Sequence, residues 1–293
     1  MSIVESTMHP VAAAVATPAH APFDTRAAWD RIAPLYDRTN TPTQMWLGHE
    51  GLRRAGVGPG VQFVDVAAGS GALSIPAARL SARVLATDQS ALMLELLRQR
   101  ARDEGLDIET RVMDGHALEL GDAQYDVAGS QFGVMLFPDM PRGIREIARV
   151  VKPGGRVLVT AYGDPHRIDF LGFFVSAIQA VRPDFSGPPI EPPPLPFQLQ
   201  DPARLREVLA AAGLTRVRVE TITETTRFGS GTQLWEWLTG SNPIVETVLE
   251  ELALTAEERS SVVQALERLV RERADASGSA ALSNPVHIGT GIR

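Results

Sequence analysis

The feature that most constrains this chain is the stretch from Val61 to Ser74, with the sequence VQFVDVAAGSGALS. Its first half is a nearly continuous run of β-branched and aromatic residues, which is typical of a strand buried on both faces. The small residues Ala67 to Gly71 then suit a tight turn, and apolar residues at helical spacing follow. A strand, a glycine-rich turn and a helix N-terminus together form a cradle for an anion or a nucleotide, because backbone N–H groups and the helix dipole face the ligand.

Two ligand classes fit such a cradle. A dinucleotide-binding loop requires G-x-G-x-x-G, and Ser74 stands where that fingerprint has its third glycine. An acid precedes the small residues instead, so the stretch reads Asp65-x-Ala67-x-Gly69-x-Gly71. This pattern resembles motif I, D/E-x-G-x-G-x-G, of the class I S-adenosylmethionine (SAM) methyltransferases, with Ala67 in place of the first glycine. The turn alone leaves other α/β nucleotide binders open.

Composition narrows the remaining classes. A length of 293 residues favours one large α/β domain with additions over two independent domains. The net charge of −7 argues against a nucleic-acid surface. The absence of cysteine excludes disulfides, Cys-ligated zinc and thiol catalysis, and no metal site is expected. No apolar run approaches a membrane span, and the first residues lack the basic region of a signal peptide, so we expect a cytoplasmic protein.

A second acid follows the glycine turn at a suggestive distance. Ala82 to Ala86 reads as the second strand, and Asp88 at its end lies 88 − 65 = 23 residues after Asp65. An acid in this position can accept hydrogen bonds from both ribose hydroxyls of a nucleotide, although a turn-capping role is the simpler alternative. Ser90 caps the next helix. Gln89 is expected to bind the cofactor, and Met93 either lines the adenine pocket or is a core residue.

The third and fourth strands end in further polar residues. Ile108 to Met113 predicts a strand that is followed by Asp114-Gly115-His116, where Asp114 can accept a hydrogen bond from the adenine amine. His116 in this turn either binds the cofactor or has a structural role. Tyr125 to Ser130 predicts the fourth strand, and Gln131 or Phe132 after it would border the methyl donor and the acceptor. Because parallel strands end at one edge of a sheet, these residues should meet there.

Together these motifs resemble the class I methyltransferases, and most closely the group of the ubiquinone/menaquinone C-methylases (methyltransferase type 11). The matching stretches are Asp65-Val-Ala-Ala-Gly-Ser-Gly, Leu85-Ala-Thr-Asp88, Met113-Asp114-Gly-His-Ala-Leu, Tyr125-Asp126-Val and Val151-Lys-Pro-Gly-Gly-Arg-Val-Leu-Val. The resemblance implies a Rossmann-like α/β fold whose seven-stranded sheet is mostly parallel with an antiparallel last strand. It also implies SAM as cofactor.

The same resemblance assigns roles to single residues. It implies that Asp65 and the turn Gly69-Ser70-Gly71 lie near the methionine part of SAM, Asp88 at the ribose, Asp114 at the adenine, and Gln131 at the end of the fourth strand. The N-P-P-Y-type tetrad of amino-methylating nucleic-acid enzymes is absent after that strand. A small-molecule acceptor is therefore expected rather than a nucleic acid.

The chain before the first strand is expected to cover the site. Residues 1–22 predict a flexible tail, and residues 23–57 a helical lid. Within the lid, one helix starts at Thr25 and is bent or ended by Pro34, and a second helix spans Thr43 to Ala55. Tyr36, a polar aromatic residue at a helix end, can cover the cofactor, whereas Trp29 fits packing on the sheet as well as contact with a ligand.

The main domain, residues 58–293, carries two insertions at 163–200 and 231–275. The first contains a Phe-rich helix followed by a stiff, Pro-rich segment from Ser186 to Gln200. The second separates strand six (Thr215 to Thr225) from a last strand near Val286 to Ile292. It predicts helices at Thr232 to Leu238, at Pro243 to Leu252 with Asn242 as cap, and at Ala256 to Ala274, the last with the capping box Thr255 to Glu258. These helices would form either an acceptor lid or a packing or dimer element, and a homo-oligomer is possible.

These features predict a SAM-dependent methyltransferase that moves a methyl group to an oxygen or carbon of a small, largely apolar acceptor, in quinone-like or secondary-metabolite chemistry. A phenol, enol or acidic carbon acceptor would profit from a general base. His166, after strand five, is the first candidate, with a surface histidine as the alternative. Asp139, His49, Tyr36 and Glu236 cannot be ranked from sequence. An NAD(P)-dependent oxidoreductase and a non-catalytic SAM-binding protein are the other hypotheses.

Overall fold

The computed structural model describes residues 25–187, 194–241 and 243–293. Seven strands form one sheet in the order β3-β2-β1-β4-β5-β7-β6, in which β7 runs antiparallel to both of its neighbours and the other pairs are parallel. The strands are β1 (Gln62–Val66), β2 (Arg83–Asp88), β3 (Ile108–Val112), β4 (Tyr125–Gln131), β5 (Val151–Tyr162), β6 (Thr215–Phe228) and β7 (Ala280–Ile292). The mostly parallel sheet with an antiparallel last strand is therefore confirmed.

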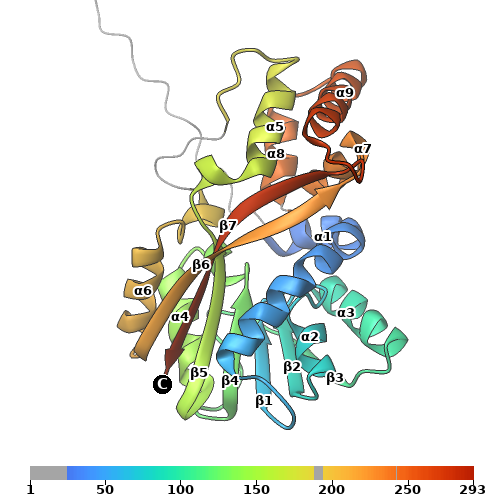
Figure 1. Cartoon of the computed structure of the whole chain (residues 1–293). Coiled ribbons are helices and arrows are strands. Elements are labelled where there is room, and N and C mark those ends of the chain that lie inside the picture. The colour runs from blue at the N-terminus through green and yellow to red at the C-terminus, as the bar shows by residue number, and fades with distance from the viewer. Residues whose placement is uncertain (1–24, 188–193, 242) are drawn as a thin grey trace, which may run out of the picture.

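Helices cover both faces of this sheet (Figure 1), with α1, α2 and α3 on one face and α4 and α6 on the other. Their bounds are α1 (Thr25–Ala55), α2 (Ser74–Arg79), α3 (Ala91–Asp103), α4 (Met140–Val150), α5 (Asp169–Gln179), α6 (Pro202–Ala211), α7 (Gly231–Ser241), α8 (Pro243–Glu251) and α9 (Ala256–Arg273). Short 3₁₀ helices are η1 (Val134–Leu136), η2 (Pro165–Arg167) and η3 (Leu195–Phe197). The helices bury the apolar strands on both faces, as Phe63 and Val64 of β1 show with no exposed surface.

The chain before β1 differs from the prediction of two helices. It forms one helix, α1, that runs through both Pro34 and Pro42. Both prolines are exposed, whereas Ala33 and Leu47 are fully buried. A proline removes one backbone hydrogen bond, and on the solvent side the carbonyl that it leaves free can face water. Packing of the buried face therefore keeps the helix continuous across positions that the sequence marks as breaks.

The stretch Lys152 to Gly155, whose proline and glycines would suit a turn, lies inside a strand. β5 begins at Val151, opposite Tyr125 of β4, and the pairing resumes at Arg156 after a register shift. The end of the chain supports the bulge, because the Gly154 N–H donates to the Arg293 carbonyl and the Arg293 N–H donates to the Gly155 carbonyl. The glycines thus form a β-bulge held by the C-terminus.

The last two strands are longer than predicted and carry most of the inserted helices. β7 pairs with β5 from Ile292 back to Val286, opposite Tyr162, and then continues with β6 alone as far as Ala280. Around this outer part of the β6–β7 hairpin lie α5, α7, α8 and α9, which we call the helical cap (Figure 1). The predicted capping box of α9 is present at Thr255 and Glu258.

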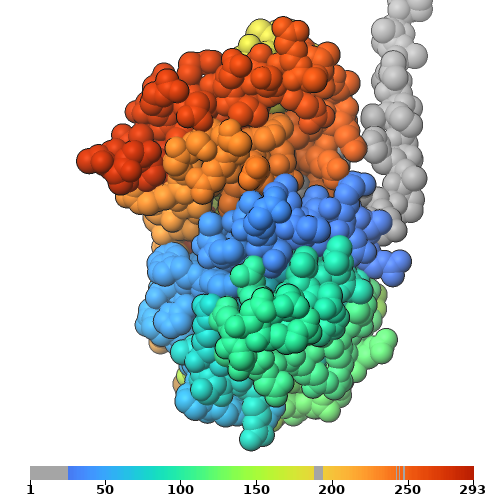
Figure 2. All heavy atoms as spheres, turned by 90° about the vertical axis from the view of Figure 1, so that its right-hand side faces the viewer, coloured from blue at the N-terminus to red at the C-terminus, as the bar shows by residue number. Residues whose placement is uncertain are grey.

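Figure 2 shows how the parts fit together: α1 forms a band between the helical cap above and α3 and its neighbours below. The predicted tail at residues 1–22, the Asn242 cap and residues 188–193 of the Pro-rich segment lie outside the described residues. Within the described ranges, no helix combines the length and apolarity that crossing a membrane requires.

Candidate active site

The glycine turn between β1 and α2 has a strained backbone. Ala67, Gly69 and Gly71 have φ angles of +57°, +53° and +103°. Two bonds fix the turn: the Ala68 N–H donates to the Thr87 carbonyl of β2, and the Gly71 N–H donates to the Ala68 carbonyl. Glycine adopts such angles freely, whereas Ala67 does so at a cost of about 1–2 kcal/mol. Strain of this kind persists where the surrounding structure holds the backbone, often at a binding site.

Asp65, the acid of the motif, lies buried directly beneath the turn with 1% of its surface exposed. Its Oδ2 accepts a hydrogen bond of 2.6 Å from the hydroxyl of Ser74, the first residue of α2. Its Oδ1 has no partner among the described residues. Burial raises the pKa of the Asp65 carboxyl to about 7, with the hydrogen bond from Ser74 opposing the rise. A buried acceptor atom without a partner is a site for a donor or a cation.

Asp88 at the end of β2 holds the turn from the other side. Its Oδ2 accepts from the Gly69 N–H at 2.8 Å, and its Oδ1 accepts from the Ser90 N–H at 2.9 Å. Burial raises the pKa of Asp88, and these backbone hydrogen bonds partly offset the rise. Ser90 also caps α3, as predicted, because its hydroxyl accepts from the Met93 N–H. The carboxylate therefore stands between the turn and the N-terminus of α3.

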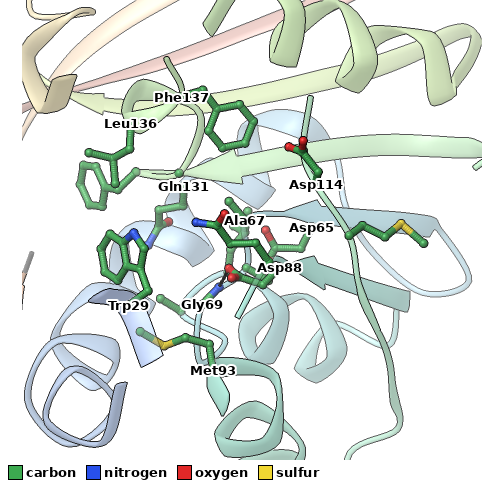
Figure 3. A pocket seen from close by; sticks show the side chains of 18 of the residues that line it. Trp29, Asp65, Ala67, Gly69, Asp88, Met93, Asp114, Gln131, Leu136 and Phe137 are labelled. Carbon is green, nitrogen blue, oxygen red and sulfur yellow. Dashed lines mark hydrogen bonds between the residues drawn. The ribbon is translucent and has the colours of Figure 1, made fainter. Parts of the chain in front are cut away.

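These residues border a cavity of about 950 Å³ that is open to solvent (Figure 3). The residues expected at the cofactor that line it are Tyr36, Asp65, Ala67, Gly69, Asp88, Gln89, Met93, Asp114, Gly115, His116 and Gln131. In Figure 3, Asp65, Asp88 and Asp114 come from neighbouring strand ends, and Trp29 and Leu136 face them from the opposite side.

Two residues expected at the cofactor do not line the cavity. Ser70 is fully buried, and its hydroxyl lies 2.6 Å from the hydroxyl of Thr41 on α1. Gly71 faces away, since a Cβ there would lie 3.0 Å from Leu97 of α3 and 3.1 Å from Ile75. Both residues sit behind the turn and fix it to the surrounding helices.

At the end of β3, Asp114 and His116 form a small polar group. The carboxylate Oδ1 of Asp114 lies 2.8 Å from the backbone N and 2.8 Å from the ring Nδ1 of His116. Burial opposes ionisation of Asp114, but these hydrogen bonds prevail and lower its pKa. The His116 ring packs on Phe137, with the ring centroids 4.6 Å apart. Asp114 and His116 thus give this part of the cavity a polar surface, and the ring of Phe137 gives it a flat apolar one.

Sequence reasoning predicted part of the apolar wall. The apolar run after strand four is too long for a strand, which suggests a pocket wall, and Phe132, Leu136, Phe137 and Pro138 do line the cavity. It did not single out Leu73 and Met113, and it left Trp29 open between the sheet and a ligand. Phe132 has a φ of +56°, an uncommon angle for an aromatic residue, and its ring stacks on Tyr162 at 4.2 Å.

The structure does not bring His166 to this cavity. It lies in η2 with an exposed side chain, and its backbone N–H donates to Asp164. Of the other candidate bases, Asp139 caps α4, and the side chains of His49 and Glu236 are exposed. Tyr36 alone lines the cavity, where its hydroxyl donates to Gln44 Oε1 at 3.1 Å.

Comparison with known proteins agrees with this site. A model of the methyltransferase domain family matches residues 64–159. The 2-phytyl-1,4-naphtoquinone methyltransferase of Trichormus variabilis is 30% identical over 161 residues, 50% of this chain and 69% of that protein. The YcgJ protein of Bacillus subtilis has the same fold, with a TM-score of 0.51 and 14% identity, over 85% of this chain and 97% of that one.

The chain spans about half the length of the first curated relatives that it matches. One of them, an uncharacterised protein of Mycobacterium tuberculosis, is 37% identical over 140 residues, which are 48% of this chain and 50% of that protein. The fold and the strand-end carboxylates define a Rossmann-like cofactor site. The chain belongs to the class I methyltransferases, in the group of the ubiquinone/menaquinone C-methyltransferases, whose cofactor is S-adenosylmethionine.

Proposed function

We propose that this protein transfers a methyl group from SAM to an oxygen or carbon of a small, largely apolar acceptor with quinone-like or secondary-metabolite chemistry. The observation that carries the proposal is the pairing of Asp65 and Asp88 at the strained turn, opposite an apolar wall in the same cavity. The Trichormus relative, named as acting on a naphthoquinone, supports an aromatic acceptor.

The residues of the cavity fit the parts of SAM. Asp88 accepts the ribose hydroxyls, and Asp65 offers its unpartnered Oδ1 to the positively charged methionine end. Asp114 with its Gly115 backbone would bind the adenine amine, and Phe137 and Met93, which line the same cavity, would contact the ring. Tyr36 covers Gly69, since a Cβ on that glycine would lie 3.7 Å from the tyrosine ring. When bound, SAM supplies an activated methyl group, so the protein has to align the acceptor and exclude water.

The oxidoreductase hypothesis is disfavoured by the same residues. Ser74, in place of the third glycine, is buried and donates its hydroxyl to Asp65, so the position is used for a different purpose. The family match also favours the methyltransferase.

Calorimetric titration with SAM, S-adenosylhomocysteine (SAH), NAD⁺ and NADP⁺ tests the proposal. We expect wild type to bind only SAM and SAH, and Asp88→Ala to bind them more weakly by about 1–3 kcal/mol, because hydrogen bonds to a charged group are lost. Asp164→Ala is the matched control, since Asp164 caps η2 outside the cavity and its loss should leave the affinity unchanged. Binding of a nicotinamide cofactor alone would overturn the proposal, and SAM binding without methyl transfer would indicate a non-catalytic relative.

A further inference from the structure

A second buried carboxyl lies beyond the cofactor cavity, on the outer part of β6. Glu224 is 2% exposed, and its Oε2 accepts from the Nδ2 of Asn284, its partner on β7, at 3.3 Å. Its Oε1 has no partner among the described residues. No basic side chain of the described residues pairs with it. Burying a charged carboxyl without a cation is costly, so the groups around Glu224 have to account for its position.

Two tyrosines connect Glu224 with the cofactor cavity. The pKa of Tyr36, which lines the cavity, is raised by burial and then by the charges of Asp88, Glu224 and Asp65. The pKa of Tyr162 is raised by burial and then by Glu224. Tyr36 is therefore close both to the carboxyls of the cavity and to Glu224.

Gln44 of α1 joins these tyrosines. Its Oε1 accepts from the Tyr36 hydroxyl at 3.1 Å, its side chain bonds the Tyr162 hydroxyl, and its carbonyl accepts from Gln131 Nε2 at 3.1 Å. Asn40, one helical turn before Gln44, points to the same region, because side chains four residues apart share a helix face. Asn40 and Gln44 are 0% and 5% exposed, so α1 presents a buried polar face to this region.

The atoms without partners in this region are mainly acceptors. The amide nitrogens of Asn40, Gln131 and Asn284 each donate to an identified oxygen, which fixes how the amides are oriented. Their oxygens, like Glu224 Oε1, lack partners among the described residues. The hydroxyls of Thr160 and Thr226 also lack partners there, and a hydroxyl can accept a hydrogen bond. Acceptor atoms of this kind favour a ligand that donates hydrogen bonds, such as one with hydroxyl groups, over an anion.

Aromatic rings lead from the cavity wall to Tyr162, which lies close to Glu224, and on into the helical cap. Phe132, which lines the cavity, stacks on Tyr162 at 4.2 Å; Tyr162 packs edge-on against Phe170 at 5.6 Å, and Phe170 against Trp237 at 5.0 Å. The rings come from β5, α5 and α7, and thus lead from the cofactor cavity into the helical cap. A flat apolar body is the shape that such a row of rings accommodates.

We propose that Glu224 is the general base for the acceptor, a hydroxylated aromatic or enolic molecule whose ring lies along this aromatic row. The inference rests on the proposed function and names the substrate class of the same site. The carboxylate Oε1 of Glu224 takes the proton of the acceptor hydroxyl: the O–H bond breaks, a new O–H bond forms on Glu224, and the electron pair stays on the acceptor oxygen. That pair, directly or through the conjugated carbon, forms the bond to the methyl carbon while sulfur keeps the pair of the bond that breaks.

The site also meets the other requirements of a base. Burial raises the pKa of Glu224 to about 7, with the Asn284 hydrogen bond opposing it. A base with a pKa near the working pH is the most effective one. The hydrogen bond from Asn284 of β7 holds its Oε2, so the carboxyl is positioned before the acceptor arrives.

Binding of 1-naphthol to the complex with SAH, compared with 1-methoxynaphthalene, tests the inference. The two probes share the ring, but only 1-naphthol donates a hydrogen bond. We expect wild type to prefer 1-naphthol by about tenfold to a hundredfold, as for a hydrogen bond to a charged group. Glu224→Gln should lose this preference and keep its SAH affinity, because Asp65 and Asp88 are untouched. Glu220→Gln, the same substitution at an exposed position of β6 that pairs with Arg54, should keep both.

The outcomes separate the inference from the proposed function. Equal binding of the two probes to wild type, or no binding of 1-naphthol while SAH binds, would overturn the role of Glu224 and leave the cofactor site standing. A Glu224→Gln variant that keeps the preference would do the same. Failure of SAH to bind to wild type would instead overturn the methyltransferase proposal itself.

Discussion

The two ends of this site are built from different kinds of structure. At the proposed cofactor end, Asp65 lies two residues before Ala67 of the turn, Asp88 contacts Gly69 from the end of β2, and both are held by backbone N–H groups or a serine hydroxyl. At the proposed acceptor end, Glu224, Tyr162 and Trp237 come from β6, β5 and α7, and meet only because the β6–β7 hairpin extends past the sheet under the helical cap. Contacts around one turn thus fix the end that we propose for the cofactor, and distant segments form the end that we propose for the acceptor.

Helix α1 belongs to both ends. Gly48 packs against the glycine turn, where an added Cβ would lie 2.4 Å from the Ala72 carbonyl. Earlier in the helix, Leu35 and Thr39 contact Gly240 of α7, where an added Cβ would lie 2.7 Å from Leu35. The helix therefore ties the cofactor turn to the cap, with Tyr36 and Gln44 between them.

The largest expected effect is on the pH dependence of folding. Burial raises the pKa of both Asp65 and Glu224 to about 7. The unfolded chain releases these protons near pH 4, so the free energy of unfolding falls as pH rises from about 4 to about 7, by at most about 4 kcal/mol per carboxyl. In urea unfolding, Asp65→Asn and Glu224→Gln should each flatten the profile and be more stable than wild type at pH 8.

SAM should distinguish the two carboxyls. Its positive charge favours ionised Asp65, so SAM at pH 8 should raise the stability of wild type and Glu224→Gln more than that of Asp65→Asn. A profile for Asp65→Asn with the wild-type slope would contradict this account of the cofactor end.

Two glycine substitutions should separate the ends by packing. Gly48→Ala forces α1 away from the glycine turn, and Gly231→Ala forces α7 from α9, where the added Cβ would lie 2.2 Å from the Glu267 backbone. Each should lower the free energy of unfolding by about 1–3 kcal/mol. Only Gly48→Ala should also weaken SAH binding. Gly172→Ala, with nothing within 4 Å, is the control and should be neutral or stabilising.

A smaller effect is expected at the strained turn. Ala67→Gly should raise the free energy of unfolding by up to about 1 kcal/mol, because Ala67 adopts a φ of +57° that glycine adopts without strain. Ala68→Gly, whose φ is not positive, should lower stability by a similar amount. A destabilised Ala67→Gly would mean that contacts of the alanine methyl outweigh the strain.

The grouping of carboxylates around the cavity was predictable because its information is local. Asp65 and Asp88 lie at the ends of β1 and β2, Asp114 follows β3, and the parallel sheet brings these strand ends together. The sequence was less informative about side-chain direction within the turn, so Ser70 and Gly71 were placed at the cofactor although they face the helices. It also predicted two helices where burial of both halves keeps α1 continuous.

The acceptor end was not predictable for a physical reason. The first half of β6 leaves Val217 and Val219 half-buried, whereas its outer half buries Glu224, Thr226 and Phe228 under the cap. A glutamate among threonines gives no sign of burial, and Asn284 is its partner only through the register of β6 with β7. His166 was chosen by its place after a strand, but the 3₁₀ helix there turns it to solvent.

The division between the two ends is tested most directly by steady-state transfer of a labelled methyl group to 1-naphthol in wild type, Asp88→Ala and Glu224→Gln. Asp88→Ala should raise the KM for SAM by about tenfold to a hundredfold without changing the KM for 1-naphthol. Glu224→Gln should lower kcat by about a hundredfold or more, with the KM for SAM unchanged. A Glu224→Gln variant that turns over like wild type, or that loses SAM affinity as Asp88→Ala does, would contradict the account.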